Sequence, residues 1–182
     1  MEEGIVQNVK KGFIRRHWFL IVFLILLVLC GLIYYTLFYK TYNVQSETSG
    51  QSVNPVSDLS VEEAVIQFNS GFVSYLLYNI GAWQLHNPPL SSDTPKIEID
   101  VGDEIYNAVV EKGNINVQKG KIDSKDIIII LTKEEAVKMM KDSNYVKESF
   151  KSGGSRIELV AGETTLFLKG YLKLYNELSD EN

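Results

Sequence analysis

The chain has 182 residues, a formal net charge of −5, one cysteine and two histidines. This length suits one compact domain and is too short for a barrel enzyme or a two-domain dehydrogenase. A single cysteine excludes a disulfide scaffold and a cysteine-based zinc site, and the acidic balance argues against a nucleic-acid-binding protein.

An uninterrupted apolar segment lies near the N-terminus. Residues 18–39 contain no charged residue, and as a helix they would extend roughly 33 Å, enough to cross the hydrocarbon core of a bilayer. Trp18 lies at one edge of the segment, and Tyr34 and Tyr35 lie near the other, as in the aromatic belts of membrane proteins. We therefore predict a transmembrane helix at residues 18–40 rather than a buried core helix.

Two cleavable segments are alternatives to a retained anchor. A secretory signal peptide would have an apolar core of about 7–15 residues that ends in small residues. A prepilin leader would fit the Lys10-Lys11-Gly12 sequence, but Arg15 and Arg16 would then stay on the mature chain and no Glu follows at the usual place. We expect the segment to be retained, with Cys30 inside it as a small packing residue.

The distribution of basic residues predicts the orientation of the chain in the membrane. Four basic residues lie within residues 1–17, whereas only Lys40 follows the apolar segment before Lys96. By the positive-inside rule, residues 1–17 form a cytoplasmic tail and the C-terminal part lies outside the cell membrane. Residues 41–182 hold 13 Lys and Arg against 21 Asp and Glu, a net charge of −8. We expect so acidic a part to stand away from anionic headgroups.

The external part is expected to consist of a linker and one folded domain. Residues 41–58 are rich in Ser, Gln, Asn and Thr with few apolar anchors, a composition typical of a flexible tether. Residues 59–182 are expected to fold on core packing alone, because they contain no cysteine. No Asn-x-Ser/Thr acceptor is present in the external part, which favours a prokaryotic source over a eukaryotic ectodomain.

The domain is expected to begin with an amphipathic helix. Ser60 and Glu63 have the spacing of a capping box, and Leu59 is placed as a hydrophobic staple. Apolar residues then recur at steps of three and four as far as Trp83, and Pro88 and Pro89 mark the exit into a loop. This stripe consists of Val61, Val65, Phe68, Phe72, Leu76, Ile80 and Trp83.

Short strands are predicted next. Residues 96–101 alternate between apolar and polar side chains, and within 114–118 Ile115 and Val117 share one face. Residues 104–110 lie between them, and turns at Gly102 and Gly113 separate the three segments, so we expect an antiparallel meander. The continuous run at 127–131 is rich in β-branched residues and suits a strand covered on both faces.

Two strand-to-helix steps complete the predicted domain. The run at 127–131 leads into Thr132-Lys-Glu-Glu135, a second capping-box pattern. A helix with Met139 and Met140, a short helical piece and a strand at 156–160 follow. A closing helix at 166–178 has Phe167, Tyr171, Leu174 and Leu178 on one stripe. The order predicts an α+β domain with a five-stranded, mainly antiparallel sheet and helices packed on one side.

This order resembles the sterol carrier protein domains. The segment DIIIILTKEEAVKMM is similar to that family's strand-then-helix step, and FKSGGSRIELVAGETTLFLKGYLKLYNEL resembles its ending. The resemblance covers roughly residues 60–178, and it implies a layer of sheet and helices around an apolar cavity for a lipid or acyl chain. It implies no catalytic residues.

Candidate site residues follow from the aromatic stripe and the two methionines. We expect the apolar pocket, if the domain has one, to be lined by Phe68, Phe72, Leu76, Trp83, Met139, Met140 and Phe167. The alternative for the same residues is ordinary core packing. No hydrolase, phosphate-loop or metalloprotease motif is present, so we predict no enzyme activity, no metal and no cofactor.

Three further features have both a structural and a functional interpretation. Glu62-Glu63 and Glu134-Glu135 lie in first helical turns, where they complement the helix dipole. His86 is interpreted as a loop residue, with a gate to a pocket as the alternative. The loop from Ser152 to Arg156 is interpreted as a plain turn, with an anion site as the alternative.

The sequence thus predicts a single-pass membrane protein that binds a lipid or another apolar ligand without catalysis. Its expected partners are the bilayer, through residues 18–40, and an acyl chain or similar ligand, but no nucleic acid. The alternative function is a membrane-tethered interaction module that contacts a protein of a cell-envelope complex. A membrane-bound enzyme is the third hypothesis.

Overall fold

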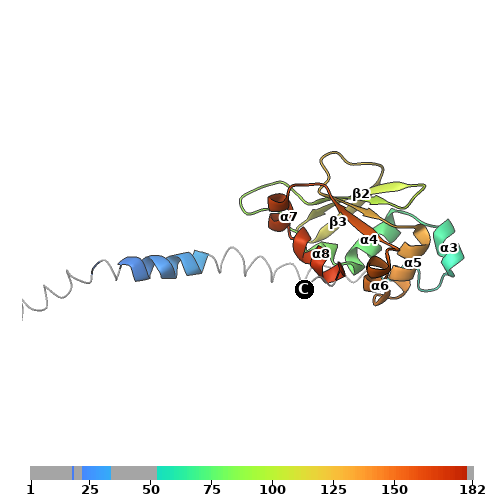
Figure 1. Ribbon diagram of the computed structural model, residues 1–182, viewed down its shortest axis with the longest axis horizontal. Coiled ribbons are helices and arrows are strands. Elements are labelled where there is room, and N and C mark those ends of the chain that lie inside the picture. The colour runs from blue at the N-terminus through green and yellow to red at the C-terminus, as the bar shows by residue number, and fades with distance from the viewer. Residues whose placement is uncertain (1–17, 19–21, 34–52, 180–182) are drawn as a thin grey trace, which may run out of the picture. The chain divides into compact units, whose positions relative to one another are not determined.

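The computed structural model describes residue 18 and residues 22–33 and 53–179 (Figure 1). The chain divides into two compact units, Met1–Glu47 and Thr48–Asn182. Residues 22–33 are helical, and their apolar side chains are exposed. Among the described residues, no helix has both the length and the hydropathy of a membrane span, and residues 19–21 and 34–40 of the predicted span lie outside them.

The C-terminal unit is an α+β domain, as predicted. Its elements in chain order are α3 (Val61–Ile66), α4 (Ser70–Asn79), η2 (Ala82–Gln84), β1 (Lys96–Asp100), β2 (Ile105–Glu111), β3 (Asn114–Lys119), β4 (Ile127–Ile130), α5 (Lys133–Lys141), α6 (Tyr145–Ser152), β5 (Arg156–Leu159), α7 (Glu163–Lys169) and α8 (Tyr171–Ser179). The domain's buried apolar residues all come from residues 56–178, so it carries a core of its own.

The five strands form one mixed sheet in the order β3-β2-β1-β4-β5. Three of the four pairings are antiparallel, and the central β1–β4 pairing is parallel, with Ile97 opposite Ile127. The expected meander β1-β2-β3 is therefore present, but the sheet is not antiparallel throughout. The chain leaves β3 at one edge and crosses back over β2 and β1, so β4 enters beside β1 in the same direction.

One face of the sheet carries the core. Because side chains alternate along each strand, the register places one set of apolar residues on a common face, where α4 packs on β2 and β3. In Figure 1 the helices α4, α5, α6 and α8 lie on one side of the sheet. The buried members of that set are Ile97, Ile99, Tyr106, Ala108, Val110, Ile127 and Ile129.

The opposite face is covered by the connection from β3 to β4. Glu98 and Asn107 are paired across β1 and β2, and both are buried despite their polarity. The Asn107 side chain donates to the Gly120 carbonyl at 3.0 Å, and the Glu98 carboxylate accepts from the Ile122 N–H at 3.3 Å and pairs with Lys125. Burial opposes ionisation of Glu98, but these donors outweigh it and lower its pKa.

The predicted first helix is broken into three pieces. The capping box of Ser60 and Glu63 is present and starts α3. The chain then leaves the helix, because Asn69 adopts an extended conformation and its side-chain oxygen accepts from the N–H groups of Gly71, at 2.8 Å, and Phe72. A left-handed Gly81, with φ of 89°, separates α4 from the single turn η2. Local capping thus overrides the continuous apolar spacing.

The packed part of the chain begins before Leu59. Val56 is fully buried, the Asn54 amide donates to the Met140 carbonyl at 2.8 Å, and the Val56 N–H donates back to the Asn54 side chain. Residues 53–58, which the sequence placed in the linker, therefore belong to the domain. Although this segment is mostly polar, Val56 anchors it in the core and the Asn54 amide ties it to the Met140 carbonyl.

The predicted closing helix is also divided. Gly170 ends α7 with φ of 87°, and α8 starts at the next residue. Tyr171, Leu174 and Leu178 are buried as expected, together with Leu166. Phe167 is not on that buried stripe, because the left-handed glycine turns α8 relative to α7 and the 3.6-residue spacing does not continue through it.

Candidate functional site

Five of the seven predicted pocket residues meet in the core. Phe68, in the connection between α3 and α4, and Phe72 of α4 are 8% and 6% exposed. Their rings meet edge to face with centroids 5.9 Å apart. The Phe68 ring also meets Tyr106 of the sheet at 6.0 Å. Leu76, Met139 and Met140 are buried in the same cluster. The space between α4 and the sheet is thus occupied by closely packed rings in this part of the domain.

The other two predicted residues lie elsewhere. Trp83 is half-buried on η2, and its ring lies 6.4 Å from that of Tyr78. Phe167, on α7, is 69% exposed. The structure therefore does not bring the seven residues into one lining.

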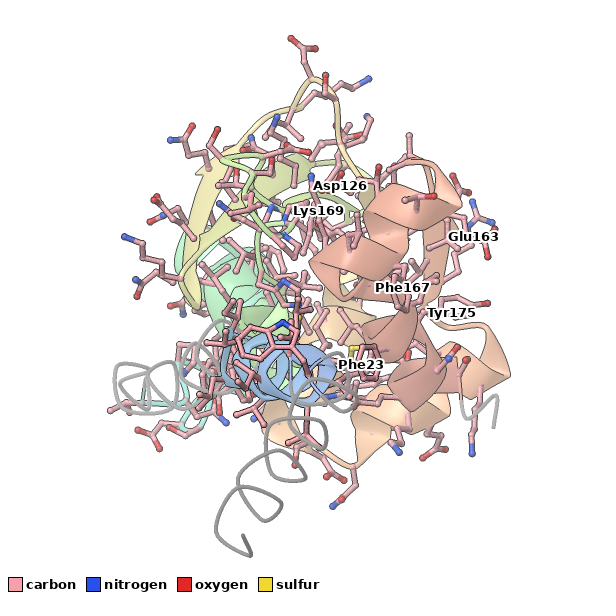
Figure 2. All side chains as sticks on the ribbon, turned by 90° about the vertical axis from the view of Figure 1, so that its left-hand side faces the viewer. Phe23, Asp126, Glu163, Phe167, Lys169 and Tyr175 are labelled. Atoms are coloured by element: carbon pink, nitrogen blue, oxygen red, sulfur yellow. The ribbon has the colours of Figure 1, made fainter. Side chains whose placement is uncertain are left out.

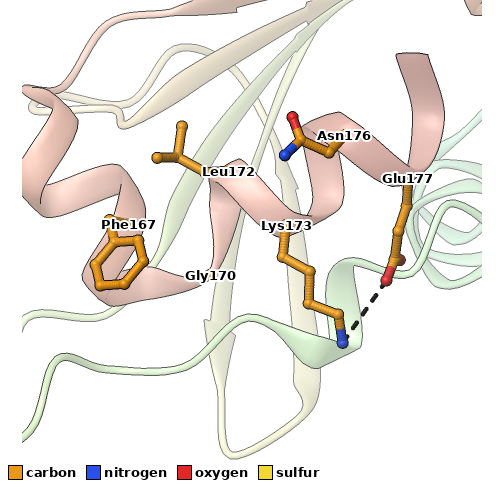
Figure 3. Close-up of a pocket in the computed structure, with 6 residues that line it drawn as sticks. All are labelled: Phe167, Gly170, Leu172, Lys173, Asn176 and Glu177. Atoms are coloured by element: carbon orange, nitrogen blue, oxygen red, sulfur yellow. Dashed lines mark ion pairs between the residues drawn. The ribbon is translucent and has the colours of Figure 1, made fainter. Parts of the chain in front are cut away.

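A pocket of about 480 Å³ opens at the junction of α7 and α8. Its lining consists of Phe167, Gly170, Leu172, Lys173, Asn176 and Glu177 (Figure 3). The break at Gly170 makes this site, because it places the last turn of α7 at an angle to the first two turns of α8. Phe167 is the only one of these residues that the sequence indicated.

The pocket has an apolar wall and a polar wall. Phe167 and Leu172 contribute the apolar side, whereas Asn176 and the ion pair of Lys173 with Glu177 contribute the polar side. The Lys173 ammonium lies 3.6 Å from the Glu177 carboxylate and donates to the Gln84 side chain at 3.2 Å. Both charged side chains are about half exposed, so their pairing is easily exchanged for another partner.

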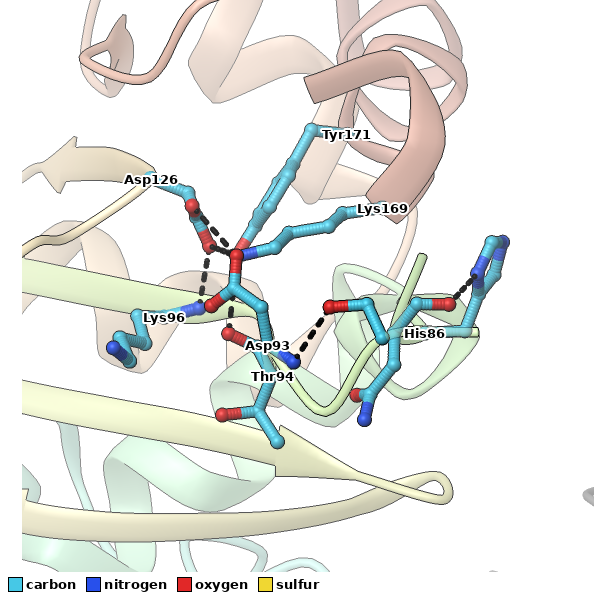
Figure 4. A network of polar contacts seen from close by, with 9 residues as sticks. His86, Asp93, Thr94, Lys96, Asp126, Lys169 and Tyr171 are labelled. Carbon is cyan, nitrogen blue, oxygen red and sulfur yellow. Dashed lines mark hydrogen bonds and ion pairs between the residues drawn. The ribbon is translucent and has the colours of Figure 1, made fainter. Parts of the chain in front are cut away.

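A buried ion pair lies beside the Gly170 break between α7 and α8. Lys169, the last residue of α7, is 1% exposed, and its ammonium contacts the Asp126 carboxylate at 3.0 and 3.1 Å (Figure 4). It also contacts the Asp93 carboxylate at 2.8 Å and donates to the Thr94 carbonyl at 3.1 Å. Three acceptor groups thus match the three N–H donors of a charged lysine.

Asp126 is the centre of this buried cluster. Its carboxylate accepts from the Lys96 N–H at 2.7 Å and from the Tyr171 hydroxyl at 3.1 Å, and its carbonyl accepts from the N–H groups of Val160 and Ala161. In Figure 2, Asp126 and Lys169 lie next to each other where α7 meets the sheet. Burial, followed by the Asp126 charge, raises the pKa of Tyr171. The cluster fastens β1, β4, α7 and α8 together.

Sequence analysis did not identify Asp126 or Lys169. A signal was present, since Lys169 lies on the apolar stripe of its helix, three residues after Leu166, and Asp126 directly precedes the isoleucine run. Two opposite charges inside apolar patterns suggest a buried pair, but they are separated by 43 residues, and no local pattern joins them.

Side chains of α6 hold one of the chain's own carboxylates beside the loop that follows this helix. Glu135 accepts hydrogen bonds from Ser149 at 2.7 Å and Tyr145 at 3.0 Å and pairs with Lys138 at 2.8 Å. A Cβ on Gly154 would lie 2.8 Å from the Glu135 carboxylate, so a larger residue there would displace that side chain. Burial opposes the charge, but the hydrogen bonds prevail and lower the Glu135 pKa. The anion that the loop at Ser152–Arg156 faces is therefore Glu135.

Two further predicted features have structural partners. Thr132 caps α5 by accepting from the Glu135 N–H at 3.2 Å, while the Glu135 side chain points to α6 rather than back to the cap. The backbone N–H of His86 donates to the Lys169 carbonyl at 3.3 Å. The ring Nδ1 of His86 lies 3.1 Å from the Asn87 carbonyl. His86 thus lies beside the Gly170 turn.

A partly exposed charged cluster surrounds the turn between β1 and β2. Glu104 accepts from the Tyr106 hydroxyl and pairs with Lys119 at 3.0 Å and Lys133 at 3.2 Å. The Tyr106 hydrogen bond, followed by those from the two lysines, lowers the pKa of Glu104 to about 2. Within residues 53–179 and the described part of the N-terminal unit, no group of three or more His, Cys, Asp or Glu residues is placed to hold a metal ion.

No protein-family model and no curated protein matches this chain. Among solved structures, it is similar to Sterol Carrier Protein 2 Like 2 from Aedes aegypti, with 12% identity over 65% of this chain and 96% of that one, at a TM-score of 0.36. It is also similar to the stereoselective inverting sec-alkylsulfatase Pisa1 from Pseudomonas sp., with 9% identity over 65% of this chain and a TM-score of 0.31.

A double mutant of the sec-alkyl sulfatase PisA1 is similar over 47% of this chain, with 12% identity and a TM-score of 0.35. The chain spans only 12% and 15% of the two alkylsulfatase chains. TM-scores in this range assign no family.

Proposed function

We propose that this protein is a single-pass membrane protein whose C-terminal domain binds an apolar ligand, such as an acyl chain, without catalysis. The observation that carries the proposal is the pocket between α7 and α8, with the 69% exposed ring of Phe167 in its wall. It is an open hollow whose volume of about 480 Å³ is comparable with that of small-molecule sites. The ligand class comes from the sequence resemblance to sterol carrier protein domains.

The two walls of the pocket suit an amphiphile. An acyl chain against Phe167 and Leu172 removes apolar surface from water, and this burial is the main source of affinity. A polar or carboxylate head group would reach Lys173 and Asn176. Because Lys173 is only loosely paired at 3.6 Å, it exchanges partners at little cost.

The absence of catalysis is part of the proposal and rests on how the nearby polar groups are used. Lys169 and Tyr171, which flank Gly170, are both buried and bonded to Asp126 rather than directed into the pocket. Because their polar atoms are already engaged by Asp126, neither side chain is placed to react with a ligand in the pocket. Lys169 and Tyr171 therefore stabilise the fold, and we propose that the residues lining the pocket only bind the ligand.

The membrane anchor at residues 18–40 is proposed from the sequence, with a cytoplasmic N-terminus and an external domain. The helical conformation of residues 22–33 and the exposure of their apolar side chains are consistent with it, since such a helix needs an apolar environment. The charge asymmetry around the segment supports the direction.

A matched pair of phenylalanine variants tests ligand binding. Residues 53–182 are purified without detergent, analysed by native mass spectrometry for a bound lipid, and titrated with a fluorescent fatty acid. Phe167→Ala should weaken fatty-acid binding about fivefold or more while changing stability little, because the ring is exposed. Phe72→Ala should instead cost about 3–5 kcal/mol in the free energy of unfolding, because it leaves a void.

The opposite pattern contradicts this placement. If Phe72→Ala changes acyl-chain selection at little cost in stability, the ligand lies among the core residues predicted from the sequence. If the unaltered domain binds no fatty acid and carries no lipid, the ligand proposal fails.

The second candidate function is an interaction module for a partner protein of the cell envelope. The observation that favours it is the contact of Phe68 with both Phe72 and Tyr106, which fills the space between α4 and the sheet with rings. The exposed Phe167 would then be a protein contact. Absence of any bound lipid, together with a large stability loss in Phe72→Ala, supports this second candidate.

A further inference from the structure

Exposed apolar side chains gather on both sides of the loop that enters α7. Leu159 and Val160, before the loop, are 45% and 50% exposed, and Phe167 and Leu168, on α7, are 69% and 37% exposed. These four residues are called the α7 rim. The two halves are held near each other, because Asp126 accepts from the Val160 N–H through its carbonyl and from Lys169 through its carboxylate.

The α7 rim meets the pocket at Phe167. Phe167 belongs to both, as a rim residue and as part of the pocket lining (Figure 3). Whatever covers the rim therefore also lies at the mouth of the pocket. An aromatic ring beside a leucine is the type of surface that enters the boundary between lipid headgroups and acyl chains.

The length of the chain brings a lipid surface within reach. Between the end of the proposed anchor at residue 40 and the first described residue of the domain, Val53, lie residues 41–52. Fully extended, these residues span at most about 40 Å, whereas a folded chain of this size has a radius of gyration of about 14 Å. The domain is thus held within reach of the membrane that carries the proposed anchor, and tethering raises its effective concentration there.

The charges near the rim select the kind of lipid. Lys169 is buried, so along residues 156–177 the exposed cations are Arg156 and Lys173. They are outnumbered by the carboxylates Glu158, Glu163 and Glu177, and residues 41–182 carry a net charge of −8. Repulsion from anionic headgroups disfavours an acidic bilayer and leaves the apolar contact as the attraction.

We propose that the α7 rim is the surface by which the domain contacts a bilayer of neutral or zwitterionic lipid, with the pocket opening onto that lipid. The inference rests on the proposed function, because this contact is the route by which an acyl chain enters the pocket without crossing water. It limits the expected repulsion of the acidic domain to membranes with anionic headgroups.

Vesicle flotation of residues 53–182 tests this contact. The domain should float with phosphatidylcholine vesicles and float less well, at low salt, with vesicles containing phosphatidylglycerol. The double variant Phe167→Ser with Leu168→Ser should lose about tenfold or more in partitioning. The matched control, Ile66→Ser with Leu90→Ser, removes side chains that are 84% and 102% exposed elsewhere and should bind vesicles like the unaltered domain.

Circular dichroism and thermal unfolding establish that each variant is folded before flotation. The proposal is overturned if the unaltered domain does not float, or if the rim variant and the control variant bind equally. It is also overturned if ultracentrifugation shows a dimer that the rim variant abolishes, because a second copy is then the occupant. Fatty-acid titration without vesicles separates the two proposals: fatty-acid binding without flotation removes only the membrane contact, and flotation without fatty-acid binding removes only the ligand.

Discussion

At the scale of single residues, position in the fold decides what a charged side chain contributes. Lys169 and Lys173 are four residues apart in the same C-terminal region, yet one is 1% exposed and the other 60%. Lys169 has three acceptors around its ammonium, whereas Lys173 has two loose partners at the mouth of a pocket. The first lysine therefore serves stability, and the second is available to a ligand.

Replacement of these two lysines by methionine should separate the roles. Lys169→Met leaves Asp126 buried without its cation and should lower the free energy of unfolding by about 3–5 kcal/mol. Lys173→Met, the matched control on the exposed side, should change it by less than about 0.5 kcal/mol. Denaturant unfolding of both variants measures the difference, and equal losses would contradict a buried, structural pair at Asp126.

At the scale of elements, caps and glycines rather than apolar spacing determine where helices end. Asn69 breaks a stripe that continues through it, and Gly170 divides the closing helix. Each break has a consequence for the site. The first lets Phe68 turn onto Tyr106, and the second leaves Phe167 exposed beside the pocket.

Two glycines of the closing region provide a test of that interpretation. Gly170→Ala should destabilise the domain by about 1–2 kcal/mol, because φ at this position is 87° and a Cβ is strained there. Gly162→Ala should stay within about 0.5 kcal/mol, because φ is −64° and no atom lies within 4 Å of the new Cβ. Thermal unfolding distinguishes them, and an equally mild effect at Gly170 would mean that the α7–α8 break is not enforced by this residue.

At the scale of the whole molecule, the two units differ in whether their apolar side chains are buried within the unit itself. The C-terminal unit draws its core from its own residues, whereas the described helix at residues 22–33 exposes apolar side chains along its length. An anchor outside a self-sufficient domain is the arrangement that the proposed function requires. For the same reason the vesicle experiment uses the domain without the proposed anchor, because the anchor would bind lipid by itself.

Protease accessibility tests the orientation in the membrane. Protease added to intact cells that express the full chain should remove the domain and leave a fragment that contains the short N-terminal tail, because basic residues precede the apolar segment. Epitope tags at the two ends report the fragments by immunoblot. If the C-terminal tag is protected until the cells are lysed, the domain lies inside the cell and the proposed topology is wrong.

The sequence by itself determined the class of fold, the three-strand meander, the strand-to-helix step after the isoleucine run and the capping box at Ser60. These features depend on side-chain periodicity and on contacts within about four residues, which are present in the linear pattern. Only the tertiary structure decided that β4 lies parallel to β1, that Asp126 meets Lys169 across 43 residues, and that Phe167 faces a pocket while Phe68 and Phe72 fill the core. Such choices depend on which distant surfaces bury one another, and local spacing contains no information about that pairing.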